Sequence, residues 1–365
     1  MYKRQILGTG VFFTPSITAR IAGPWMIIAW IAIGLISILL ASMFGELVER
    51  MPSAGGMYEY TKQAFGIFPS FIVGWLAILA SNITISMLIV GAIKYLNPSL
   101  PSIFTIIFGL IIIWGFAFIA SLGLKTSIFT LLAFALITFG SIAISAILGL
   151  EHINPVNLDF SNFPGMLPLM LAIFIAADTF FGWESATYLS EEVKNPRKTI
   201  PRAFRHATIL IVIIVLILVF GLLASMGVSQ LGISNTPIFD LFNNFLGPRY
   251  AFIASLLIYL AIIGSVADWV VSSPRLLLAM ARDKEMIAQL AEIHPKRRVP
   301  QKAIIFQAVL SSVVLLIGVG TYRVILETLL PLTFLLYAFL GIVLLRIRKK
   351  QEYKPKYPVY LGKLG

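Results

Sequence analysis

The stretch that decides the fold, residues 173–202, reads IFIAADTFFGWESATYLSEEVKNPRKTIPR. Its first half is an apolar span that carries two acids, Asp178 and Glu184, around Gly182, and its second half is a basic loop. A carboxylate inside a membrane costs several kcal/mol unless it is paired, protonated or facing water, so such an acid indicates a functional site. The glycine allows the helix to open, and open backbone at bilayer depth is tolerated where it is buried in protein or lines a cavity. The pattern therefore favours a solute transporter.

Composition points the same way for the whole chain. Of its 365 residues, 59% are hydrophobic and 12% are charged, and the mean hydropathy is +0.93. Too little polar surface remains to cover a water-soluble globule, so we predict an all-α polytopic membrane protein. Because a spanning helix needs about 20 apolar residues, the sequence accommodates about ten transmembrane helices. The predicted spans cover residues 8–22, 23–48, 66–96, 102–121, 124–150, 166–190, 203–227, 250–281, 302–320 and 324–347.

The net charge of +12 is distributed unevenly along the chain. If the N-terminus is cytoplasmic, 23 of the 28 Lys and Arg residues fall on the cytoplasmic side, mainly in the loops 194–205 and 282–302 and in the tail. This positive-inside bias predicts a multi-pass protein of the cell membrane with both termini in the cytoplasm. The positive charge then sets topology and meets the lipid bilayer, and nucleic acid is not expected as a partner.

The ten spans divide into two sets of five, residues 1–150 and 166–347, followed by a basic cytoplasmic tail over 348–365. The first span of each set is interrupted at glycine, at Gly8-Thr9-Gly10 in the first set and at Thr179 to Gly182 in the second. An odd number of spans per set gives the two sets opposite topology, and in such inverted repeats the substrate binds at mid-membrane between two broken helices.

Four segments carry a family resemblance. Together and in this order, they resemble the amino acid permeases of the amino acid, polyamine and organocation transporter superfamily. The resemblance implies the 5+5 inverted-repeat fold of sodium-coupled amino acid transporters, and secondary transport of amino acids or related amines by alternating access, as a symporter or an antiporter. The segments are GTGVFFTPSITARIAGP (8–24), GELVERMPSAGGMYEYTKQAFG (45–66), FFGWESATYLSEEVKNPRKTIPRA (180–203) and SSPRLLLAMARDKEM (272–286).

The two ends of the chain depart from the family pattern. Family members usually carry about fifteen apolar residues before the glycine motif, where this chain has MYKRQIL, and they continue for two further helices after the tenth span. We therefore expect a chain truncated at both ends. This leaves open a second interpretation, a non-transporting remnant or subunit of such a permease.

Candidate substrate-binding residues lie at the two helix breaks. Gly8, Thr9 and Gly10 precede a helix whose unpaired N–H groups and positive dipole end suit a substrate carboxylate. By the resemblance, Asp178 occupies a position where the family usually has an aromatic residue against the substrate. A carboxylate there would favour cationic substrates, or it is an acid that selects nothing.

The resemblance implies further roles for individual residues. Asn82 and Trp269 match residues that border the substrate in arginine/agmatine exchangers, and the alternatives are an interhelical hydrogen bond for Asn82 and core packing for Trp269. Glu184 matches a glutamate linked to proton sensing, and its alternative is a helix-stabilising acid. Phe181 and Trp183 flank the central glycine and complete the predicted substrate site.

The coupling ion stays open between Na⁺, H⁺ and uncoupled exchange. Ser265 lies near where sodium-coupled relatives bind Na⁺, and Asp268 is a candidate second proton site. Thr138 falls where some proton-coupled relatives have a lysine, and a hydroxyl cannot replace an ammonium. At the inner end of the eighth span, Arg282 and Asp283 either form a gate ion pair or are solvated.

An intramembrane enzyme is the rival outside transport. The chain has no cysteine and no H-E-x-x-H zinc helix, and its three histidines fall in or near loops. Asp178 and Asp268 lack any signature of an acid dyad, so we predict no enzyme, no metal site and no cofactor beyond a coupling ion. The expected partners are an amino acid or amine and the bilayer, with the oligomeric state left open.

Overall fold

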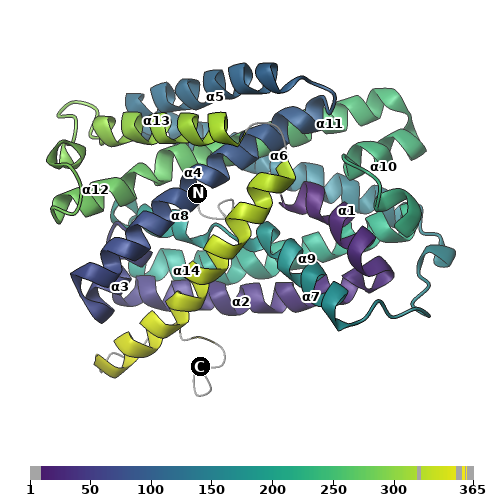
Figure 1. Cartoon of the computed structure of the whole chain (residues 1–365), viewed down its shortest axis with the longest axis horizontal. Coiled ribbons are helices and arrows are strands. Elements are labelled where there is room, and N and C mark those ends of the chain that lie inside the picture. Colours follow the sequence, from purple (N-terminus) through teal and green to yellow (C-terminus); the bar gives the residue numbers. More distant parts are fainter. Residues whose placement is uncertain (1–9, 319–321, 351–355, 358, 360–365) are drawn as a thin grey trace.

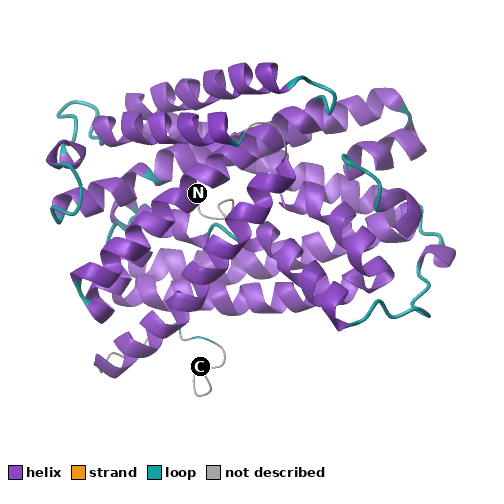
Figure 2. Ribbon diagram, in the orientation of Figure 1, coloured by secondary structure: helices purple, strands orange, loops and turns teal. Residues whose placement is uncertain are grey.

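The structure, a computed structural model, describes residues 10–318, 322–350, 356–357 and 359, without the side chains of residues 124–131. Every regular element among these residues is a helix, and loops of varied length connect the helices (Figure 2). Eight helical stretches of the described chain are long and apolar enough to cross a membrane. The predicted all-α polytopic membrane fold is confirmed.

The first part of the chain contains long helices together with the shorter helices α1 and α3. Here the chain forms α1 (Gly10–Ala22), α2 (Met26–Arg50), α3 (Met57–Phe65), α4 (Ile67–Leu96), α5 (Ser102–Leu122) and α6 (Leu124–Glu151). The second part forms α7 (Met166–Ala176), α8 (Trp183–Tyr188), α9 (Pro196–Leu231), α10 (Pro237–Leu246), α11 (Pro248–Ser272), α12 (Pro274–Arg282), α13 (Gln301–Ile317) and α14 (Tyr322–Lys350).

The predicted spans fall on these helices, with differences where the backbone is interrupted. The span predicted over 250–281 consists of α11 and α12, which separate at Ser273 because Pro274 lacks a backbone N–H. The span predicted over 302–320 corresponds to α13, a shorter apolar helix of 17 residues. The division into two inverted repeats, 1–150 and 166–347, stays a prediction.

The helices pack as one bundle whose outer surface is apolar. Helix α9 lies along α2, and α11 packs against α4 and α6 (Figure 1). Gly149 and Gly221 let α6 and α9 approach closely, because a methyl group on Gly149 would lie 2.8 Å from the carbonyl carbon of Gly221. Side chains such as Phe118 and Leu136 are 64% and 69% exposed, as expected for a surface that faces lipid.

The bundle has two polar ends. Helices α3 and α12 lie at one end of the molecule, and α10 lies at the opposite end (Figure 1). We call these the α12 end and the α10 end. The basic loop that follows α12, over residues 283–300, belongs to the α12 end.

Candidate functional site

A break between α7 and α8 forms the centre of the candidate site. Helix α7 ends at Ala176, a 3-10 turn covers Ala177–Phe180, and Phe181 is extended. Gly182 then has a φ of 120°, a value that L side chains rarely adopt, and α8 begins at Trp183. The predicted opening of this span at Gly182 is confirmed.

The start of α1 crosses directly over this break. A methyl group on Gly10 would lie 2.5 Å from the backbone nitrogen of Thr179, so only glycine permits the observed approach. The hydroxyls of Thr14 and Thr179 are 3.4 Å apart, and Thr14 also donates to the Gly10 carbonyl at 2.7 Å. The two elements that the sequence marks as irregular thus meet inside the bundle. Gly8 and Thr9 lie outside the described residues.

Tyr337 of α14 holds the opened backbone. The Gly182 N–H donates to the Tyr337 hydroxyl at 3.0 Å, and the same hydroxyl donates to the Glu184 carboxylate. The Phe181 ring packs edge-on against Tyr337, with 5.0 Å between centroids. Tyr337 and Glu184 are both buried. One hydroxyl therefore satisfies two polar groups that the break would otherwise leave unpaired.

Asp178 lies on the other side of the break and is 3% exposed. Tyr322, the first residue of α14, donates its hydroxyl to the carboxylate at 3.4 Å. The Tyr322 ring stacks on Phe13 with centroids 4.4 Å apart, and Phe13 meets Tyr95 edge-on at 5.3 Å. These rings form an aromatic layer that covers Asp178 from the α10 end.

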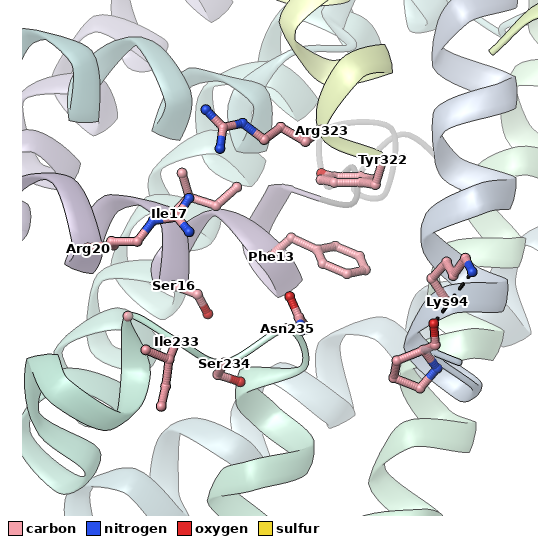
Figure 3. Close-up of a pocket in the computed structure, with 12 residues that line it drawn as sticks. Phe13, Ser16, Ile17, Arg20, Lys94, Ile233, Ser234, Asn235, Tyr322 and Arg323 are labelled. Carbon is pink, nitrogen blue, oxygen red and sulfur yellow. Dashed lines mark hydrogen bonds between the residues drawn. The ribbon is translucent and has the colours of Figure 1, made fainter. Parts of the chain in front are cut away.

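A cavity of about 380 Å³ lies on the outer side of the aromatic layer (Figure 3). Its walls come from α1, the end of α4, the segment before α10 and the start of α14. It combines aromatic, hydroxyl, amide and cationic groups. Its lining residue Tyr322 also contacts the carboxylate of Asp178. It is lined by Phe13, Ser16, Ile17, Arg20, Lys94, Pro98, Gly232, Ile233, Ser234, Asn235, Tyr322 and Arg323.

A helix break that meets the start of α1 beside a cavity is the arrangement expected of a carrier, and comparison with known proteins agrees. Residues 4–363 match the family described as amino acid permease. The chain belongs to the amino acid permease family. It is a multi-pass membrane protein, and the resemblance given by the four sequence segments is confirmed.

Relatives of this permease with assigned activities carry small solutes. It is 26% identical to the serine/threonine exchanger SteT of Bacillus subtilis (strain 168), over 97% of this chain and 84% of that protein. It is 28% identical to the human large neutral amino acids transporter small subunit 2, over 96% of this chain and 69% of that protein. It is 27% identical to the methylthioribose transporter of Bacillus subtilis (strain 168), over 81% and 68%.

Asn82 lies in a polar cluster between α4 and α13 of the permease. Its side-chain oxygen accepts from Gln307 at 2.9 Å and from Ser311 at 2.8 Å, and its nitrogen donates to the Ile78 carbonyl at 2.7 Å. These bonds match the interhelical alternative and hold α13 against α4. Contact of Asn82 with substrate stays a prediction.

The other predicted site residues are buried at several places in the bundle. Trp183 is fully buried, and its ring packs edge-on against Phe204 with centroids 5.5 Å apart. Trp269 and Asp268 are buried in α11, as is Ser265. The substrate and coupling roles of these residues stay predictions.

Thr138 lies in α6 and carries no charge into the bundle. Its hydroxyl donates at 2.9 Å to the carbonyl of Phe134, one turn earlier in the same helix. The hydroxyl is therefore hydrogen-bonded within its own helix. Thr138 supplies no ammonium group at the position where the resemblance places a lysine in some proton-coupled relatives.

Charged pairs join several elements at the α12 end. Asp283 accepts from Lys62 at 2.7 Å and from Tyr58 at 2.8 Å, both on α3. Arg282 instead donates to Glu191 at 3.1 Å. Of the two alternatives left open by the sequence, a pair between Arg282 and Asp283 is not what the structure has, because each side chain bonds a different neighbour at the end of α12. These contacts join α12 to α3 and to the turn after α8 at the α12 end.

The environment of Asp283 shifts the titration of its two partners. Burial disfavours the charged ammonium of Lys62, but its hydrogen bond to Asp283 and the nearby Glu59 outweigh burial and raise its pKa. Burial, together with the hydrogen bond to Asp283 and the charge of that carboxylate, raises the pKa of Tyr58. Both groups therefore keep their protons at neutral pH, and the bonds of this cluster do not depend on pH near neutrality.

A second charged cluster, which sequence reasoning missed, joins α2 to α14. Arg348 donates to Glu46 at 2.9 and 2.6 Å, and Arg50 donates to the same carboxylate at 3.0 Å. The backbone nitrogen of Val359 also donates to Glu46, at 3.2 Å. Glu46 is fully buried, so the carboxylate depends on these partners.

Proposed function

We propose that this permease carries amino acids across the cell membrane by secondary transport with alternating access. The observation that carries the proposal is the contact of Gly10 with Thr179, which brings the start of α1 against the break between α7 and α8. The N–H groups at the start of α1 suit the substrate carboxylate. The carbonyl groups that the break frees, together with Asp178, suit its ammonium group.

The arrangement of the two ends supports an outward-open resting state. The basic loops gather at the α12 end, which by the positive-inside rule faces the cytoplasm. The cavity at the α10 end then opens to the outside, with both chain termini in the cytoplasm. Clasps such as Lys62–Asp283 would open when the carrier turns inward.

Glu184 is the group that we propose for proton coupling. It is buried, and its hydrogen-bond partner Tyr337 is a neutral hydroxyl, with no cation paired to it among the described residues. Uptake or release of a proton there would change the bonding of Tyr337 to Gly182, and so the helix break itself. Coupling to Na⁺ near Ser265 and uncoupled exchange are the alternatives.

Asp178 supports a narrower proposal, a preference for cationic substrates. A buried carboxylate beside the helix break would pair with a cationic side chain or a second amine. The activities assigned to the relatives, serine/threonine exchange and transport of large neutral amino acids, instead favour neutral substrates. The two hypotheses differ for arginine, which a carrier of cationic substrates would prefer and a carrier of neutral substrates would not.

Uptake into proteoliposomes tests the proposal. We expect saturable uptake of labelled serine, leucine or arginine, measured with and without internal amino acid, with Na⁺ or choline, and across a pH gradient. Dependence on internal amino acid would identify exchange, and dependence on Na⁺ or pH would identify the coupling ion. A purified protein that neither transports nor binds any amino acid would contradict the proposal and support the non-transporting alternative.

A further inference from the structure

The cavity at the α10 end carries an excess of positive charge. Arg20, Lys94 and Arg323 line it, and no acidic side chain does so among the described residues. Arg323 is paired with Glu327 at 2.6 Å. Asp240 lines a neighbouring pocket, and its carboxylate accepts a hydrogen bond from the Ser234 hydroxyl. The field inside the cavity is therefore set by Arg20 and Lys94.

Neither of these two cations is neutralised by a carboxylate of the described chain. Lys94 donates to the carbonyls of Leu100 and Pro98, at 2.5 and 3.4 Å, and both are neutral acceptors. The guanidinium of Arg20 is exposed and forms no hydrogen bond or ion pair with any described residue. A side chain with five donors and a fixed charge is thus available to an anion.

Besides Arg20, a second polar group of the wall has no partner among the described residues. The Ser16 hydroxyl belongs to a residue that is 4% exposed, and no described group hydrogen-bonds to it. A buried hydroxyl without a protein partner is uncommon. In Figure 3, Arg20 lies on one side of Phe13 and Lys94 on the other, with Ser16 on the same helix as Arg20.

We propose that this cavity captures the α-carboxylate of the incoming amino acid and discriminates against amines that lack a carboxylate. The proposal rests on the proposed transport function and narrows its substrate class. Arg20 and Lys94 attract the carboxylate, while Phe13 and Tyr322 form the floor that separates the cavity from Asp178. An amine without a carboxylate meets only repulsion in this cavity.

The same charges assign the cavity a kinetic role. Charges at the mouth of a site raise the rate of capture of an oppositely charged ligand, and the effect falls as salt screens the field. Substrate capture should then depend on ionic strength for leucine, whose carboxylate faces the cations. It should show the opposite dependence for 3-methylbutylamine, which has the same side chain and no carboxylate, because its ammonium group is repelled by the cations and salt screens this repulsion.

The test compares these two ligands in proteoliposomes that contain the full chain. The variants are Arg20→Gln, Lys94→Gln and the double variant. The control is Arg249→Gln, which removes the same charge from an exposed residue at the start of α11 that does not line this cavity. The KM for leucine uptake and the inhibition constant of the amine are measured at ionic strengths of about 0.01 M and about 1 M, where the Debye length is about 30 and 3 Å.

We expect the double variant to raise the KM for leucine about 3- to 10-fold at low ionic strength, and to leave it near that of the parent at high ionic strength. The amine should inhibit the double variant as well as or better than the parent, and Arg249→Gln should behave as the parent. Because Lys94 also holds a loop, Arg20→Gln alone, which breaks no described contact, should raise the KM in the same direction.

Other outcomes would overturn the inference. Equal effects on leucine and on the amine, or an unchanged KM in both Arg20→Gln and the double variant, would show that the cavity does not read the carboxylate, while transport itself stands. If the parent protein binds no amino acid at either ionic strength, the proposed function and this inference fail together.

Discussion

Gly10 and Thr179 touch through their backbones, although 168 residues lie between them in the sequence. The contact joins the start of α1 to the turn between α7 and α8. It leaves no room for a side chain at residue 10, because an added methyl group would lie 2.5 to 2.7 Å from three atoms of Thr179. The contact of α1 with the break between α7 and α8 therefore requires glycine at residue 10.

Gly10→Ala should therefore move the start of α1 away from the break between α7 and α8. Overpacking of a close contact costs about 1–3 kcal/mol in stability, and we expect amino acid uptake to be largely lost because the two halves of the site move apart. Gly115→Ala in α5 is the matched control, since nothing lies within 4 Å of the added methyl group. Uptake and thermal unfolding in detergent measure both effects. Normal uptake by Gly10→Ala would show that the crossing is not part of the site.

Tyr337→Phe should weaken the hold of α14 on the break. The substitution leaves the Gly182 N–H and the buried Glu184 carboxylate without their shared partner, which costs about 1–3 kcal/mol. If Glu184 carries the coupled proton, the pH dependence of uptake should also shift in this variant. Tyr259→Phe, at a partly buried tyrosine of α11, controls for loss of a hydroxyl.

The pH profile of uptake tests Glu184 directly. We expect Glu184→Gln to flatten the profile, because the amide cannot exchange a proton. A profile that is unchanged in both Glu184→Gln and Tyr337→Phe would remove Glu184 from the coupling mechanism and leave Na⁺ or uncoupled exchange.

Asp178→Asn tests the preference for cationic substrates. If the carboxylate pairs with a cationic side chain, competition by arginine should weaken by about tenfold, or 1.4 kcal/mol, relative to competition by leucine. Competition by glutamate should strengthen, because a negative charge leaves the site. Glu151→Gln, at an exposed acid, is the control. An unchanged order among arginine, leucine and glutamate would leave Asp178 as an acid that selects nothing.

Glu46→Gln should destabilise the α12 end of the bundle. Arg50 and Arg348 would keep their charges without the carboxylate that they share, and breaking a buried pair costs about 3–5 kcal/mol. Glu327→Gln breaks the exposed pair with Arg323 and should cost about 1 kcal/mol or less. Equal melting temperatures for the two variants would show that the buried cluster contributes no more than a surface pair.

The break at Gly182 shows how far the sequence alone reaches. A glycine between two acids in an apolar span predicts an opened helix. The backbone freedom of glycine, seen here as a φ of 120°, and the cost of burying a carboxylate are each properties of a single residue. The apolar spans are readable for the same reason, since each residue contributes its own transfer free energy. These local terms determined the all-helical membrane fold and the neighbourhood of the site.

Side-chain partners were beyond the reach of these local terms. Tyr337 reads as one more aromatic residue of an apolar span, yet its hydroxyl serves Gly182, 155 residues away. Asn82 left a choice between substrate and a neighbouring helix, and its partner Gln307 is 225 residues away. Arg282 and Asp283 invite pairing as neighbours in the chain, but α3 and the Glu191 turn offer each a different partner.

The sequence by itself determined that the chain is a helical membrane permease, that it opens at Gly182, and that Asp178 and Glu184 lie inside an apolar span, because hydropathy and backbone preference belong to single residues. The tertiary structure decided that the start of α1 meets the break at Thr179, that Tyr337 bonds Glu184, and that the cavity is positively charged. Those facts depend on how packing brings distant helices together, and the type of a single side chain does not indicate which helix it will contact.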